Sequence, residues 1–129
     1  MHKGFLITAF FVGALAVAFG AFGAHALKEL VSQRVIVTFE TAVKYQFYHL
    51  FALIIAAVLY KDYKNKWMLA AGRLFITGLI LFCVSLYMLC FVQATVQPGF
   101  KWLGLVTPIG GVAFILGWLS MLVAVAKKK

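Results

Sequence analysis

The chain is short of charged residues, and of acidic residues above all. Only 12% of its 129 residues are charged, and only three of them are Asp or Glu. Soluble domains carry about 25% charged residues. The three acids, Glu29, Glu40 and Asp62, all lie at the edges of apolar runs or between them. A paired-carboxylate site is therefore excluded. Because the sequence also has no phosphate-binding loop and no nucleophile elbow, we expect a protein that is not an enzyme.

Cysteine is equally scarce. The two cysteines, Cys83 and Cys90, lie seven residues apart in one apolar run. On a helix that rises about 1.5 Å per residue they are about 10 Å apart along one stripe, which is too far for a disulfide bond. We interpret both as small apolar packing residues.

Apolar residues, in contrast, are abundant and come in long runs. They make up 65% of the chain and form four runs, over residues 4–27, 41–60, 69–92 and 103–126. Each run is close to the roughly 20 residues that a helix needs to cross a bilayer. The first is longer than the apolar part of a cleaved signal peptide, which has about 7–15 residues, so we expect it to be retained. The sequence predicts one all-α domain over residues 1–129, an integral membrane four-helix bundle.

Residues 28–40 differ from the rest because apolar and polar residues alternate there at helical spacing. This pattern is typical of an amphipathic helix that lies on the membrane surface. We therefore expect a short amphipathic segment between the first and second spans, with Thr38 as the N-cap of the second span.

The basic residues indicate the orientation. The net charge is +9, and the bases cluster in short flanks between the apolar runs. Eight fall on one side of the membrane and four on the other: Lys3, Lys61, Lys64, Lys66, Arg73 and Lys127–Lys129 against Lys28, Arg34, Lys44 and Lys101. The positive-inside rule then places both termini in the cytoplasm. Because the bases are not gathered on one face, we expect the lipid bilayer as their partner and no nucleic acid.

Small residues mark the places where helices approach closely. In the first span Ala9, Gly13, Ala16, Gly20 and Gly23 recur at steps of three and four, so they share one helical face. Such a stripe lets membrane helices pack closely. We expect Gly110 and Gly111 to do the same in the fourth span.

The polar residues inside the spans are the candidate site. Tyr45, Gln46 and His49 share a helical face. Such groups must point into the bundle or into water, because an unsatisfied polar atom in hydrocarbon costs several kcal/mol. They are equally well interpreted as a binding site or as interhelical hydrogen bonds. For His49 we expect a bond to the first span near Gly20–His25, or to a carbonyl of the fourth span near Pro108.

Four further positions within the spans are of interest. Tyr87, Thr107 and Pro108 are additional candidates, since a proline removes a backbone donor and frees a carbonyl within a span. Arg73, one turn inside the third span, is interpreted as an interfacial anchor that can snorkel back to the neighbouring lysines.

The histidines could in principle hold a cofactor. His25 and His49 could ligate a haem or a metal. However, His25 lies at the end of its span and His49 about two turns into the next, so their depths match poorly. No cysteine or second carboxylate completes a metal set. We expect no cofactor and no metal, and we expect His2 to be a solvated terminus.

Several of these residues form ordered motifs that resemble a known family. The motifs are Gly20-Ala-Phe-Gly-Ala-His-Ala-Leu27, Tyr45-Gln46-x-Tyr48-His49, Ser85-Leu86-Tyr87, Thr107-Pro-Ile-Gly-Gly111 and Gly117-Trp118. Together they resemble the DUF423 family of small bacterial inner-membrane proteins, also called UPF0382, which is similar to the transmembrane protein 256 group. Cys83-Val84 departs from the usual Ser-Gly at that place. The resemblance implies four membrane helices and a bacterial inner-membrane location. It implies no established activity and no catalytic residues.

Three functions follow as expectations. The first is binding of a small amphiphile, a lipid or a partner helix in a polar pocket near the outer face, around His25, Tyr45, Gln46 and His49. The second is transport of a small solute or proton by an oligomer. The third is a haem or redox function. A homo-oligomer or a membrane-protein partner is compatible with the first two.

Overall fold

The computed structural model describes residues 1–95 and 101–127, and throughout these ranges the regular structure is helical. It contains four helical segments that are long and apolar enough to cross a membrane, spanning Lys3–Leu30, Gln33–Leu59, Lys66–Thr95 and Leu103–Ala126. The predicted four-helix architecture is therefore confirmed. The elements are α1 (Lys3–Phe22), η1 (Gly23–Leu27), α2 (Lys28–Leu30), α3 (Gln33–Leu59), α4 (Lys66–Gly78), η2 (Leu79–Val84), α5 (Ser85–Thr95) and α6 (Leu103–Ala126).

The boundary before the second span differs from the prediction. Residues 33–40 do not form a separate surface helix, because they are the first two turns of α3. The chain breaks only at Val31 and Ser32, whose backbones are extended. Val35 and Phe39 are buried against Cys90, so packing inside the bundle outweighs the amphipathic pattern. The prediction of Thr38 as N-cap was wrong too: Ser32 takes that position.

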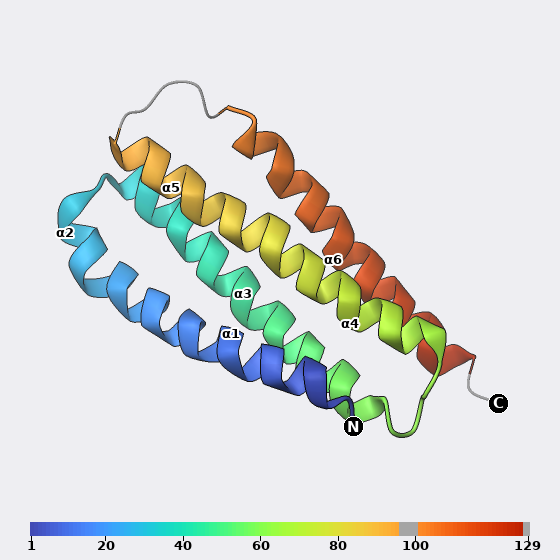
Figure 1. Cartoon of the computed structure of the whole chain (residues 1–129). Helices are drawn as coiled ribbons and strands as arrows, with labels where there is room; N and C mark the ends of the chain where they lie inside the picture. Colours follow the sequence, from blue (N-terminus) through green and yellow to red (C-terminus); the bar gives the residue numbers. More distant parts are fainter. Residues whose placement is uncertain (96–100, 128–129) are drawn as a thin grey trace.

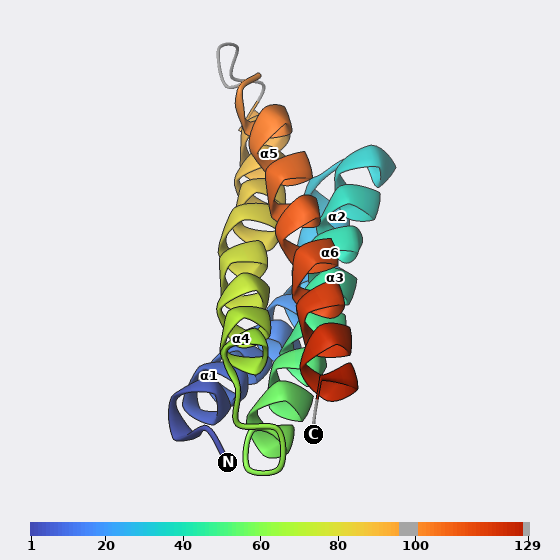
Figure 2. The ribbon, with the colours of Figure 1, turned by 90° about the vertical axis from the view of Figure 1, so that its right-hand side faces the viewer.

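The helices form two pairs that share a common centre. The α1 helix packs along α3, and α4 packs along α6 (Figure 1). The α3 helix also contacts α4, η2 and α5, so it lies at the middle of the bundle. Both termini lie at the same end of the molecule, as Figures 1 and 2 show. The turn-rich connection expected around Pro98-Gly99 lies outside the described residues.

The small-residue stripe of α1 forms its interface with α3. Ala9 and Ala16 are completely buried. A Cβ at Gly23 would lie 2.7 Å from the ring of Phe39, so any larger residue would force this buried ring to move. Gly13 and Gly20 are less restricted, because a Cβ at these positions would make ordinary contacts of 3.9 and 3.6 Å.

Gly110 and Gly111 in α6 also differ from each other. A Cβ at Gly110 would overlap the backbone nitrogen of Phe82, so α6 and η2 approach closely at this point. At Gly111 a Cβ would stay 3.9 Å from the Phe82 ring.

His2 is not a solvated terminus, contrary to the prediction. Its Nδ1 accepts a hydrogen bond from the backbone N–H of Phe5 at 3.2 Å, and its ring stacks on Phe5 with a centroid distance of 3.8 Å. Its own backbone N–H donates to the carbonyl of Ala57 at 2.9 Å. The first N–H groups of a helix lack partners within the helix, and His2 supplies one for α1.

Candidate functional site

Two buried polar residues of α3 connect the spans to one another. Gln46 and His49 are three residues apart and only 5% and 6% exposed. Gln46 lies thirteen residues after Gln33 and thirteen before Leu59, at the centre of the helix. Because buried amides and imidazoles must be hydrogen-bonded, their partners reveal how the bundle is held together.

Gln46 joins α3 to α1 and α5. Its Nε2 donates to the carbonyl of Val12 at 3.0 Å, and the Tyr87 hydroxyl donates to its Oε1 at 2.6 Å. Both ends of the amide are thus paired, one with each neighbouring helix.

His49 joins α3 to α6. Its Nδ1 lies 2.8 Å from the carbonyl oxygen of Tyr45, which can only accept, so the ring carries its proton on Nδ1. The unprotonated Nε2 then accepts from the indole N–H of Trp118 at 3.3 Å. The ring also stacks on Phe114, with centroids 3.5 Å apart and planes 9° apart.

This geometry does not fit a haem or metal ligand at His49. Both ring nitrogens are engaged, whereas a ligating imidazole needs one free. His49 is sixteen residues into α3 instead of about two turns, because the helix begins earlier than predicted. His25 is an exposed residue of η1 and does not join this cluster. Among the described residues no group of three or more His, Cys, Asp or Glu could hold a metal ion.

The other candidate residues occupy different places. Thr107 pairs with Ser85 at 2.7 Å between their hydroxyls, and Ser85 also donates to the carbonyl of Phe82. Tyr45 is 38% exposed and lies at the rim of the bundle. Arg73 is exposed on α4. The polar residues therefore do not gather in one open polar pocket.

The sequence did not reveal Trp118 and Ser85 as partners. The bond expected from His49 to the fourth span exists, but through the indole of Trp118 and not through a carbonyl near Pro108. The available signal was chemical: an indole N–H and a serine hydroxyl within apolar runs each need a partner.

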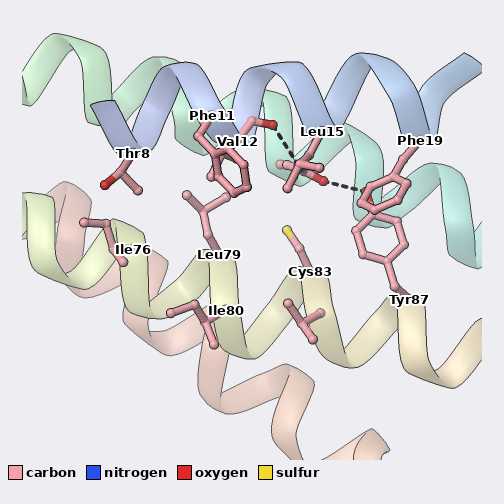
Figure 3. Close-up of a pocket in the computed structure, with 12 residues that line it drawn as sticks. Thr8, Phe11, Val12, Leu15, Phe19, Ile76, Leu79, Ile80, Cys83 and Tyr87 are labelled. Atoms are coloured by element: carbon pink, nitrogen blue, oxygen red, sulfur yellow. Dashed lines mark hydrogen bonds between the residues drawn. The ribbon is translucent and has the colours of Figure 1, made fainter. Parts of the chain in front are cut away.

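An apolar groove runs between α1 and the α4–η2–α5 span (Figure 3). Its volume is about 340 Å³. At one end of the groove the rings of Phe19 and Tyr87 meet with centroids 4.9 Å apart. It is lined by Thr8, Phe11, Val12, Leu15, Phe19, Gln46, Ile76, Leu79, Ile80, Cys83, Val84 and Tyr87.

A second hollow, of about 360 Å³, lies between α3 and α6. Aromatic rings form much of its wall, and the small residues Pro108 and Gly111 complete it on the α6 side. A third, of about 300 Å³, lies where η1 meets α3 and includes Gly20, Gly23, Glu40 and Lys44.

Comparisons with known proteins all give one family. The family model described as "Protein of unknown function (DUF423)" matches residues 19–111. A UPF0382 membrane protein of Staphylococcus aureus is 39% identical over 127 residues, covering 97% of both chains. The UPF0382 membrane protein YwdK of Bacillus subtilis is 36% identical over 126 residues, covering 97% of this chain and 98% of its own. No solved structure matches. With four apolar spans and these relatives, the chain is a multi-pass membrane protein that belongs to the DUF423 family.

Proposed function

We propose that this protein binds the hydrocarbon chain of a membrane lipid or small amphiphile in the groove between α1 and the α4–η2–α5 span, and that it is not an enzyme. The observation that carries the proposal is the lining of the groove. Its surface is formed by aliphatic and aromatic side chains from both sides, and no charged residue contributes to it. Small-molecule sites commonly have volumes of about 300–1,000 Å³ and mostly apolar walls.

The pairing of Gln46 supports an apolar occupant. The amide and the Tyr87 hydroxyl lie on the wall of the groove, but they are bonded to each other and to the carbonyl of Val12. A ligand in the groove therefore contacts mainly hydrocarbon, while the paired polar atoms of Gln46 and Tyr87 hold α1 and α5 at a fixed distance from α3. The groove follows α1 from Thr8 to Phe19, which favours a chain that lies along this helix.

A partner helix fits the groove less well than a chain does. A helix is about 10 Å across with its side chains, so most of its surface would stay outside a groove of about 340 Å³, whereas an extended hydrocarbon chain can lie within it.

The alternatives receive less support from the geometry. A path for a proton or polar solute requires polar or ionisable groups along it, whereas the groove is apolar and uncharged. A haem or redox function would need a free imidazole nitrogen, and both nitrogens of His49 are engaged.

Native mass spectrometry of the detergent-purified protein tests the proposal. Val84 lines the groove, so Val84→Trp should fill it and reduce the fraction of protein that retains a lipid by about tenfold. Val17→Trp is the matched control, because Val17 is exposed on α1 but does not line the groove. Equal lipid retention in both variants would refute the proposal.

A further inference from the structure

The hollow between α3 and α6 has a chemistry that the groove lacks. Its walls include the aromatic rings of Tyr45, His49, Phe82, Phe114 and Trp118. The rings of Tyr45 and Phe82 lie 4.6 Å apart at an angle of 31°, and those of Tyr45 and His49 are nearly parallel, 19° apart. Such walls complement a flat ring better than a flexible chain.

Among the polar side chains that line this hollow, that of Tyr45 has no hydrogen-bond partner in the part of the chain that the structure describes. His49 is fully paired: its Nδ1 donates to the carbonyl of Tyr45, and its Nε2 accepts from the indole N–H of Trp118. The Tyr45 hydroxyl makes no hydrogen bond to any of the residues that the structure describes. Twelve residues into α3, it lies far from the end of the helix. A hydroxyl at such a position gains most from an occupant that supplies an acceptor.

The faces of tyrosine and tryptophan rings are electron-rich, so an electron-poor flat ring stacks on them favourably. We infer that this hollow binds the ring of an isoprenoid quinone, a carbonyl of which accepts a hydrogen bond from the Tyr45 hydroxyl. Its prenyl tail extends into the surrounding lipid. The site differs in residues and in ligand from the groove that carries the proposed function.

The small residues of α6 make room for the ring. Pro108 and Gly111 both line the hollow. A Cβ at Gly111 would meet only the Phe82 ring, at 3.9 Å, so a larger side chain is tolerated there but enters the hollow. Gly111→Leu should therefore block the site without forcing the helices apart.

Quenching of Trp118 fluorescence tests the inference. The full chain is purified in detergent with Trp67→Phe and Trp102→Phe, which leaves Trp118 as the only one of three tryptophans. A naphthoquinone with a four-isoprene tail is titrated in. We expect saturable quenching, an affinity about five- to tenfold weaker in Tyr45→Phe, and no saturable phase in Gly111→Leu. Tyr48→Phe is the matched control and should bind normally, because Tyr48 lies on the same helix outside the hollow.

Two results would overturn the inference. One is the same affinity in Tyr45→Phe and Tyr48→Phe. The other is equal competition by geranylgeraniol, which has the tail but no quinone ring. Tyr45→Phe keeps the ring and its packing, so this comparison stands even if Gly111→Leu does not fold. Val84→Trp, which fills the groove, should leave the quenching unchanged, and this separates the inference from the proposed function.

Discussion

At the scale of single residues, the two polar side chains buried on α3 form hydrogen bonds to helices on different sides of it. Gln46 reaches α1 and α5, whereas His49 reaches α6. Hydrocarbon offers no replacement partner, so removing one member of a pair leaves the other unsatisfied. Two residues thus connect all four spans through side chains.

The pair of His49 and Trp118 gives a first prediction. His49→Leu leaves the Trp118 N–H without an acceptor and should lower the free energy of unfolding by about 1–2 kcal/mol. His49→Gln can still accept this bond and should lose less. In a double-mutant cycle, adding Trp118→Phe to His49→Leu should cost little more, measured by unfolding in detergent. Fully additive losses would show that the two side chains are not coupled.

The sequence predicted that Gln46 and His49 are buried, but it did not predict their hydrogen-bond partners. Gln46 and His49 were expected inside because hydrocarbon forces polar groups inward, and both are buried. Their partners lie up to 69 residues away in the chain, and no local pattern identifies which helices meet. Tyr45 lies at the rim, where its ring packs on Phe82 of η2 and lines the hollow beside α6.

At the scale of helices, α6 approaches η2 and the end of α4 closely. Gly110 lies against the backbone of Phe82, and Phe114 lies against Gly78. The η2 segment has π-helical geometry, and the hydroxyl of Ser85 donates to its Phe82 carbonyl. Glycine and the nearby hydroxyl pair together let these two helices pack at this point.

Gly110→Leu tests this contact. Its side chain would collide with backbone, which cannot move aside, so we expect a loss of about 3 kcal/mol or more, or failure to fold. Gly104→Leu, six residues earlier in α6, is the matched control, because no atom lies within 4 Å of its Cβ. Thermal unfolding in detergent compares the two. A Gly110→Leu variant as stable as Gly104→Leu would contradict the packing described here.

The start of α4 gives another prediction. Asn65 accepts from the backbone N–H groups of Trp67 and Met68 at 3.0 Å, and its Nδ2 donates to the carbonyl of Ala124 at 3.0 Å. Asn65→Ala should therefore cost about 1–2 kcal/mol. Ser32→Ala should cost almost nothing, because the Ser32 side chain makes no capping bond to α3. Similar losses in both variants, measured by the same unfolding assay, would refute the capping role.

The helices themselves were largely predictable from length and apolar runs. The errors lie at the ends, where packing and capping decide. The pattern of residues 33–40 predicted a surface helix. In the structure these residues belong to α3, and Val35 and Phe39 are buried beside Cys90. The acceptor role of His2 was missed because it depends on where α1 begins.

At the scale of the whole molecule, four spans bring both termini to one end (Figure 1). The excess of lysine and arginine at that end predicts that it is cytoplasmic. A green fluorescent protein fused after Lys129 should fluoresce, and alkaline phosphatase at the same position should be inactive. An active phosphatase fusion would show that the orientation is the opposite of the proposed one.

The central claim is that a hydrocarbon chain occupies the groove between α1 and the α4–η2–α5 span. The most direct measurement is photo-crosslinking in membranes with a lipid that carries a diazirine on its acyl chain, followed by peptide mapping. We expect labels concentrated on the exposed groove residues Phe11, Ile80 and Val84. Ile7, Ile109 and Leu122 are about equally exposed but lie outside the groove, so they should be labelled weakly. Labelling of both sets in proportion to exposure would contradict the account, because the groove would then be ordinary lipid-facing surface.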